Sequence, residues 1–173
     1  ALGTGDAVSA SVPVAVATDL RFASISAGNQ FTCAMTLDGA AWCWGSNVNS
    51  QLGTVAPLTG ECRLPNGNPT PCSTVPVPVD GGHAFVSVQA GLCNGCGVTP
   101  AGEAICWGSN FYGQLGRGSA GGQSATPMPV SGGLSFAQLS VGASHMCGMA
   151  SDGAGYCWGN NEYGQLGTGT KGG

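Results

Sequence analysis

The sequence predicts an all-β fold made of β-propeller blades, each with about four antiparallel strands. One gapless pattern, which begins with glycine and ends with Leu-Gly, occurs three times in the 173 residues, at 28–53, 91–116 and 142–167. A stretch of alternating apolar and polar residues precedes each copy, and no segment has a convincing helical period. Four short strands in each repeat of about 50 residues are typical of propeller blades.

The distances between equivalent residues define the repeats. Trp44, Trp107 and Trp158 are separated by 63 and 51 residues, and the leading glycines of the three copies repeat both spacings. The first period is therefore 12 residues longer than the second (63 − 51), and we place the excess in an inserted loop at 60–73. The length predicts one domain over 1–173, and the match of Leu2-Gly3 to Leu166-Gly167 indicates that a fourth repeat begins near the C-terminus. The predicted parts of the domain are repeats at 2–52, 53–115 and 116–166 and the start of a fourth repeat at 167–173.

The strands of each repeat are predicted in order. The first is the alternating segment, at 22–26, 85–89 and 136–140. The second is the short apolar run around a cysteine, and a turn that contains glycine joins it to the third, the Cys-Trp-Gly run. Proline-containing segments at 12–14, 75–79 and 128–130 are predicted as edge strands, where proline is tolerated.

Composition excludes several classes of protein. With only 4 Lys+Arg and a net charge of −4, the chain lacks the basic clusters that nucleic-acid binding requires. A hydrophobic content of 42% excludes a charge-rich disordered chain, and no apolar run reaches the roughly 18 residues of a membrane-spanning helix. The sequence starts at Ala1 without a leader, so we expect that a signal peptide has been removed or that the chain is a fragment.

The nine cysteines predict disulfides in an oxidising compartment, so we expect an extracellular or periplasmic protein. Three pairs bracket hairpin turns at one spacing, and opposite residues of a hairpin are close enough for a disulfide. A fourth pair closes the inserted loop, and Cys93 is left over, either free or bonded to another chain. The predicted pairs are Cys33 with Cys43, Cys62 with Cys72, Cys96 with Cys106, and Cys147 with Cys157. The alternative is a metal or redox site at Cys93-x2-Cys96, although no second cysteine pair and no helix accompany that motif.

The sequence offers no recognisable catalytic set. His83 and His145 are the only histidines, and the carboxylates are scattered rather than paired. The glycine-rich segment 116–122 lacks the Lys-Ser/Thr of a phosphate-binding loop. We therefore expect no enzyme activity, no cofactor and no metal, and we expect the recurring tryptophans to pack between blades.

Loops that differ between blades are the candidate contacts for a partner, because recognition usually lies in variable loops on a rigid scaffold. The alternative is that they are only solvated connections. One set of loops should line up on one face of the propeller, and the inserted loop is the second set. The candidate residues are Asn29, Gln30, Phe31, Leu92, Asn94, Ser144 and His145 in the first set, and Glu61, Arg63 and Leu64 in the inserted loop.

The pattern Gly-x4-Cys-x9-Cys-Trp-Gly-[Ser/Asn]-Asn-x3-Gln-Leu-Gly resembles the repeat of the regulator of chromosome condensation, and in particular the disulfide-containing variant of secreted bacterial proteins. The resemblance covers essentially the whole chain. It implies a propeller, usually of seven four-stranded blades, that recognises another protein through loops on one face. The chain departs from the family in two ways. The family's usual histidine is present only as His145, and the other two repeats have Phe31 and Asn94 at the equivalent position. The basic character of the chromatin-binding members is absent.

We therefore expect a non-catalytic protein-interaction scaffold whose partner the sequence does not identify. The alternatives are a structural subunit of a larger extracellular or membrane-attached assembly or filament, and a specific inhibitor or regulator of an enzyme. Three repeats leave two apolar blade faces to be covered. We favour a fragment of a longer chain with about four more blades, and the other possibilities are two copies in a six-blade ring or an open filament of copies.

Overall fold

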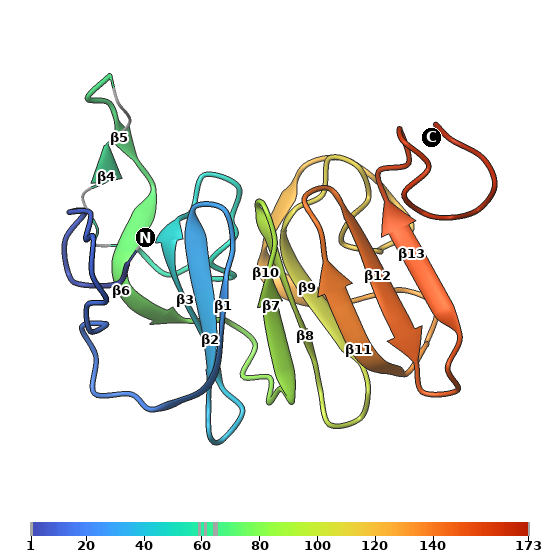
Figure 1. Ribbon diagram of the computed structural model, residues 1–173, viewed down its shortest axis with the longest axis horizontal. Coiled ribbons are helices and arrows are strands. Elements are labelled where there is room, and N and C mark those ends of the chain that lie inside the picture. The colour runs from blue at the N-terminus through green and yellow to red at the C-terminus, as the bar shows by residue number, and fades with distance from the viewer. Residues whose placement is uncertain (1, 59, 61, 64–65, 173) are drawn as a thin grey trace.

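The computed structural model describes residues 2–58, 60, 62–63 and 66–172. These residues form 13 strands and no helix, which confirms the all-β class. Eleven of the strands make three antiparallel sheets that stand side by side in chain order (Figure 1), and the other two form a small hairpin. Within this described part of the chain, no helix could cross a membrane.

The first sheet has the strand order β1-β2-β3-β6, and a small hairpin of β4 and β5 rises from the connection between β3 and β6 (Figure 1). The hairpin lies in the predicted inserted loop. The bounds are β1 (Phe22–Ala27), β2 (Phe31–Thr36), β3 (Ala41–Ser46), β4 (Cys62–Arg63), β5 (Pro69–Thr70) and β6 (Cys72–Pro78).

The second sheet has four strands in the order β10-β9-β8-β7, and the third has three in the order β11-β12-β13. No fourth strand follows β13 among the described residues, so the third sheet lacks a counterpart of β6 and β10. The bounds are β7 (Ser87–Ala90), β8 (Asn94–Val98), β9 (Ala104–Ser109), β10 (Gln123–Pro129), β11 (Phe136–Val141), β12 (His145–Ala150) and β13 (Gly155–Gly159).

Two of the three proline-containing segments are edge strands, as predicted. β6 and β10 each lie at the edge of their sheet. Proline has no N–H to donate to a neighbouring strand, and an edge strand has a neighbour on one side only. The prediction of a strand at 12–14 is wrong in this structure, where that segment forms no strand. The physical reason is that an edge strand needs a sheet to pair with, and the described residues before it, 2–11, supply none.

Tryptophan joins the second and the third sheet to the loop that follows the third strand of the sheet before it. The indole Nε1 of Trp107 donates to the carbonyl of Gln51 at 3.0 Å, and Nε1 of Trp158 donates to the carbonyl of Gln114 at 2.9 Å. The Leu-Gly glycine lies against the same indole, since a Cβ on Gly53 would sit 2.8 Å from Cδ1 of Trp107. Only glycine allows this approach, and its φ of 66° is one that other residues rarely adopt.

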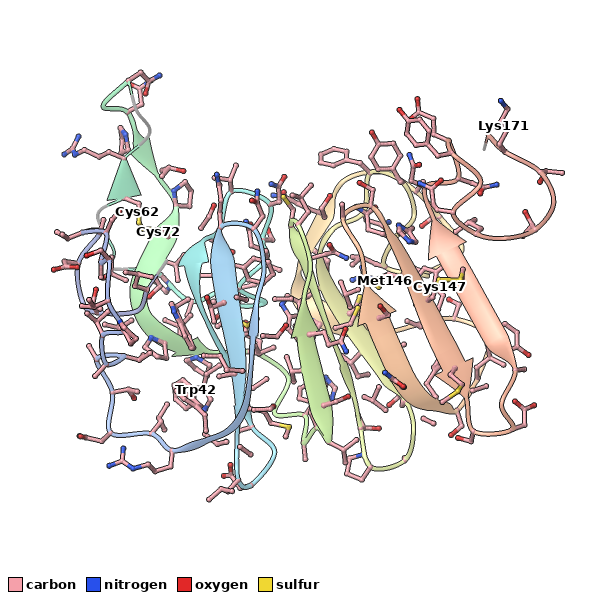
Figure 2. All side chains as sticks on the ribbon, viewed as in Figure 1. Trp42, Cys62, Cys72, Met146, Cys147 and Lys171 are labelled. Atoms are coloured by element: carbon pink, nitrogen blue, oxygen red, sulfur yellow. A yellow bond between two sulfur atoms is a disulfide. The ribbon has the colours of Figure 1, made fainter. Side chains whose placement is uncertain are left out.

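Two apolar cores fill the spaces between neighbouring sheets. The first contains the Cys33–Cys43 disulfide with Phe85 and Trp107, and the second contains Cys96–Cys106 with Leu139 and Met146. The Met146 sulfur is 3.2 Å from the sulfur of Cys96. Cys147 is the next residue of β12, so it faces the opposite side of the third sheet (Figure 2). The Cys147–Cys157 disulfide is only half-buried there, because no further sheet of the described chain covers that face.

Candidate functional site

Three short loops lie next to one another at one end of the sheets, and we call them the rim loops. They join β1 to β2, β7 to β8 and β11 to β12, at residues 28–30, 91–93 and 142–144. Gly28 and Gly91 are so close that a Cβ on Gly28 would lie 2.4 Å from the Gly91 carbonyl oxygen. Gly91 approaches the Gly142 carbonyl in the same way, at 2.6 Å. The leading glycine of each repeat therefore allows adjacent rim loops to touch.

The rim loops expose only part of the predicted contact set. Asn29, Gln30 and Leu92 are exposed, whereas Ser144 and His145 are half-buried. Phe31 and Asn94 are 1% and 0% exposed. Each is the first residue of a central strand, and its own side chain points into the space between two sheets. Both side chains are enclosed in the protein, so neither is accessible to a partner in this structure.

The buried carboxamide of Asn94 is unusual. Neither its Nδ2 nor its Oδ1 has a hydrogen-bond partner in the described structure. The equivalent positions hold an apolar ring in Phe31 and an imidazole in His145. An unpaired buried polar group costs about 1–3 kcal/mol, so Asn94 reduces the stability of the second sheet's packing.

The hairpin of β4 and β5 stands at the same end of the molecule as the rim loops (Figure 1). This placement follows from the topology, because the first and third connections of an antiparallel β1-β2-β3-β6 sheet lie at one end. A disulfide between Cys62 and Cys72 fixes the hairpin to the start of β6. Glu61 and Leu64, two of the predicted contacts, lie outside the described residues. Arg63 is described and exposed.

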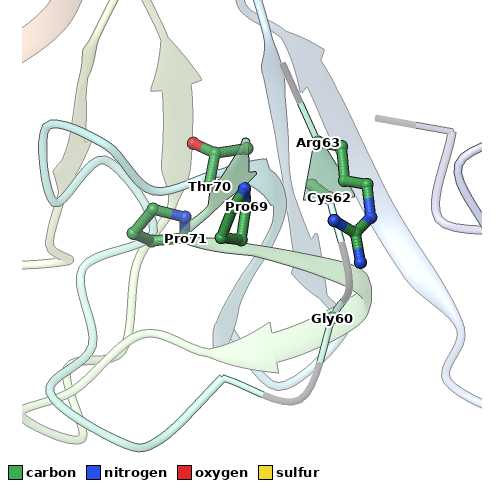
Figure 3. A pocket seen from close by; sticks show the side chains of 6 residues that line it. All are labelled: Gly60, Cys62, Arg63, Pro69, Thr70 and Pro71. Atoms are coloured by element: carbon green, nitrogen blue, oxygen red, sulfur yellow. The ribbon is translucent and has the colours of Figure 1, made fainter. Parts of the chain in front are cut away.

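Two cavities flank the hairpin and share Cys62, Arg63 and Thr70 in their walls. One, of about 390 Å³, is bounded by the two hairpin strands and Pro71 (Figure 3). The other, of about 280 Å³, lies between the hairpin and the first sheet, and its wall includes Asp6 and Gln30. We call this second cavity the hairpin cleft. It joins two residues from the predicted sets, Gln30 and Arg63, in one site.

The wall of the hairpin cleft is largely apolar, and it carries one charged side chain of each sign. Arg63, one of only four basic residues in the chain, donates from Nη1 to the Gly67 carbonyl at 3.0 Å. Asp6 lies in the wall of the cleft, as do the hydroxyl-bearing Ser46, Ser73 and Thr74. Sequence reasoning did not find Asp6, because its place in the wall depends on how the N-terminal segment follows β6: Gly5 N donates to the Thr74 carbonyl at 3.0 Å.

The four predicted disulfides are all present, and Cys93 is a free, half-buried thiol. Since Cys96 is bonded to Cys106, Cys93 and Cys96 do not form a metal or redox pair in this structure. No group of three His, Cys, Asp or Glu side chains that could hold a metal occurs in the described ranges. Burial raises the pKa of the Cys93 thiol, and a hydrogen bond with the Asn49 side chain opposes the increase in pKa.

A family model described as "Regulator of chromosome condensation (RCC1) repeat" matches residues 22–51, 85–114 and 136–165. The chain is 30% identical over 159 residues to the RCC1 domain-containing protein RUG3, mitochondrial, of Arabidopsis thaliana. That alignment covers 91% of this chain and 33% of the relative. The chain therefore spans about a third of the length of this curated relative.

Two solved structures have the same fold. Human WBSCR16 superposes with a TM-score of 0.73 at 17% identity, over 92% of this chain and 40% of that one. Yeast RCC1 (Prp20), solved bound to Kap60, superposes with a TM-score of 0.66 at 23% identity, over 85% of this chain and 34% of that one. At these identities the superpositions establish the propeller fold of the three sheets.

Proposed function

Because the chain belongs to the regulator of chromosome condensation (RCC1) repeat family, we propose that it is a non-catalytic module that binds a protein partner through the rim loops and the hairpin cleft. A similar propeller, yeast RCC1, was solved bound to another protein, Kap60. The observation that carries the proposal for this chain is the convergence of two predicted contact sets. Gln30 from a rim loop and Arg63 from the inserted hairpin line the same cleft.

The cleft combines a largely apolar wall with Arg63 and several hydroxyls, which fits a protein segment that carries a carboxylate. Variable loops on a rigid sheet scaffold are the usual place for recognition, and the Cys62–Cys72 bond limits how far the hairpin can move. Arg63 would pair with a carboxylate of the partner, and the hydroxyls of Ser46 and Thr74 would bind its main chain. The four disulfides support an extracellular or periplasmic setting, where such bonds persist.

The experiment that tests this proposal places a photo-activated cross-linking residue at one position at a time in the chain, expressed in its source organism. Positions Gln30 and Arg63 report on the cleft, and Leu37 in the turn between β2 and β3 reports on the opposite end of the sheet. All three side chains are exposed. We expect one partner to be cross-linked from Gln30 and Arg63 but not from Leu37.

A charge-reversed variant gives the matched control. Arg63→Glu should reduce the cross-link from Gln30 at least tenfold, because it replaces attraction of a carboxylate by repulsion. Arg21→Glu, an exposed arginine outside the wall of the cleft, should leave the cross-link unchanged. A partner that cross-links only from Leu37, or equally well to both charge variants, would contradict the proposed site.

A structural role is the second candidate, and one observation favours it. Within the described residues β13 pairs with a strand on one side only, and exposed edges are templates for pairing with another chain. In that role the module would be a subunit of an assembly held together by its sheets. Native mass measured at increasing protein concentration separates the two roles, since a recognition module alone stays monomeric.

A further inference from the structure

The inserted hairpin carries a dipeptide with chemistry of its own. Asn66-Gly67 lies in the turn between β4 and β5, and both residues are exposed. None of the described atoms lies within 4 Å of a Cβ built on Gly67, whose φ of 84° costs glycine no steric strain. The main-chain nitrogen of Gly67 therefore carries no side chain that would hinder its approach to the carboxamide carbon of Asn66.

The other Asn-Gly pair of the chain is enclosed. Asn94-Gly95 begins β8, an inner strand of the second sheet, and Asn94 is 0% exposed. Gly95 lies opposite Ala90 on one side and Trp107 on the other, and a Cβ on it would stand 2.6 Å from Cε2 of Trp107. The same dipeptide thus occurs once in an open turn and once where sheet pairing holds the main chain extended.

Two contacts in the hairpin favour nucleophilic attack on the Asn66 carboxamide. Asn68 N donates to Oδ1 of Asn66 at 3.1 Å, and a main-chain donor on this oxygen stabilises the negative charge that develops there when a nucleophile adds. Nη1 of Arg63 donates to the Gly67 carbonyl at 3.0 Å. This contact places a cation beside the Gly67 N–H, which must lose its proton to become the nucleophile. By contrast, Oδ1 of Asn94 has no donor in the described structure.

We propose that Asn66 is a site of spontaneous deamidation, at which the chain modifies itself with water as the only co-reactant. The Gly67 nitrogen bonds to Cγ of Asn66, the Cγ–Nδ2 bond breaks, and ammonia leaves with the proton that the main-chain amide has given up. Water then opens the resulting succinimide at either of its carbonyls, which leaves an aspartate or an isoaspartate at position 66. Nothing is oxidised or reduced, and the chain gains one negative charge.

The new carboxylate would form beside an arginine of the hairpin cleft. Arg63 already contacts Gly67, the next residue along the chain, so a carboxylate at position 66 lies within reach of its guanidinium. This carboxylate would compete with a carboxylate of the partner for Arg63, and deamidation would therefore weaken partner binding as the protein ages. The effect on binding rests on the proposed function, whereas the deamidation itself does not.

Peptide mass spectrometry of the whole folded chain, incubated at slightly alkaline pH, tests the chemistry. We expect the peptide with residue 66 to show the amide-to-acid mass change roughly tenfold faster, or more, than the peptide with residue 94, because a buried site reacts only after local opening. In the reduced and denatured chain the two peptides should react at similar rates. Equal rates in the folded chain, or no reaction at position 66, would overturn the proposal.

Two variants test the local chemistry of the turn. Arg63→Ala should slow deamidation at position 66 about threefold, because it removes a cation whose field is screened by solvent. Asn66→Gln keeps the carboxamide but would have to close a six-membered ring, so its peptide should stay unmodified over the same period. An unchanged rate in Arg63→Ala would overturn the part assigned to the arginine, and a mass change in Asn66→Gln would show that the reaction lies elsewhere in the peptide.

The cross-link from Gln30 measures the effect on binding. Asn66→Asp, which supplies the charge at once, should reduce this cross-link about threefold, and Asn66→Gln should leave it unchanged. Equal cross-linking by the two variants would overturn the effect on the cleft. If the unmodified chain itself gives no cross-link from Gln30, the proposed binding site fails, and the mass measurement still decides the deamidation.

Discussion

Trp107 donates its indole N–H to the main-chain carbonyl of Gln51, 56 residues earlier in the chain, over 3.0 Å. Trp158 and Gln114 repeat the arrangement at 2.9 Å across the next pair of sheets. The first of these hydrogen bonds is buried, and each joins the third strand of one sheet to the loop that follows the third strand of the previous sheet. Interblade packing is therefore directional: one sheet supplies the donor and its predecessor supplies the acceptor.

Trp107→Phe should lower the melting temperature of the chain. The ring is retained in part, but the buried Gln51 carbonyl loses its partner, which costs about 1–3 kcal/mol. Differential scanning calorimetry measures the change, and Trp42→Phe at a half-buried position is the control, with a smaller expected shift. Equal shifts for the two variants would mean that the hydrogen bond contributes nothing beyond ring packing.

Asn94→Leu should raise the melting temperature. Its carboxamide is buried with both polar atoms unpaired, and a leucine of similar volume removes that penalty of about 1–3 kcal/mol. Asn94→Asp is the contrasting variant, since it buries a charge in the same place and should destabilise the chain strongly at neutral pH. If Asn94→Leu melts at a lower temperature, the carboxamide has a partner that stabilises it.

The three disulfides that join neighbouring strands of the sheets should differ in how readily a mild reductant opens them in the folded protein. Cys147–Cys157 is half-buried on an uncovered face, whereas the sulfurs of Cys33–Cys43 and Cys96–Cys106 are enclosed between sheets. We expect Cys147 and Cys157 to be alkylated before these two pairs, because exchange requires access of the attacking thiolate. Peptide mass spectrometry after timed reduction and alkylation measures the order. Simultaneous opening of all three would show that the sheets separate before reduction.

The Cys93 thiol should react slowly with iodoacetamide at pH 8. Burial raises its pKa, so the thiolate fraction is smaller than in the unfolded chain. Asn49→Ala should raise this pKa further and slow alkylation again, because the hydrogen bond from Asn49 lowers it. Rates measured from pH 7 to 10 give the pKa of each variant. Faster alkylation of Asn49→Ala would indicate that the side chain blocks access instead.

Asp38 gives the chain an acid-sensitive contribution to stability. A hydrogen bond from Thr36, and then one from the Ala40 main chain, lower its pKa below the ordinary 3.8. A carboxyl whose pKa is depressed by folding contributes stability above its unfolded pKa, and that stability is lost as the pH falls through the folded pKa. Carbon-13 titration of the carboxyl should therefore place its pKa below 3.8, and Thr36→Val should move it upward. An unchanged pKa in that variant would remove Thr36 as the cause.

The repeat pattern predicted most of the architecture because each of its parts has a local physical meaning. The constant spacing from Cys33 to Cys43 predicted a cross-strand bond, and the prolines of β6 and β10 predicted edge strands. Burial in the rim was not predictable in this way. Phe31 and Asn94 follow exposed loops in the sequence, and only the approach of the neighbouring sheet encloses them. The hairpin cleft could not be predicted from the repeat pattern either. Its wall combines the inserted hairpin, which has no counterpart in the other repeats, with Asp6 from the N-terminal segment.

The inserted hairpin occupies a connection that can change length without changing the blade around it. Asn47 N donates to the Pro71 carbonyl at 2.8 Å, and Asn110 N closes the equivalent connection onto Gly122 at 2.9 Å. The first connection, 47–71, is about twice as long as the second, 110–122, and yet both end in the same main-chain bond. Doubling a flexible loop costs only about 0.6 kcal/mol in closure entropy. Each blade thus offers a graft point at which selection, or a protein engineer, can install a new recognition element while the scaffold keeps its stability.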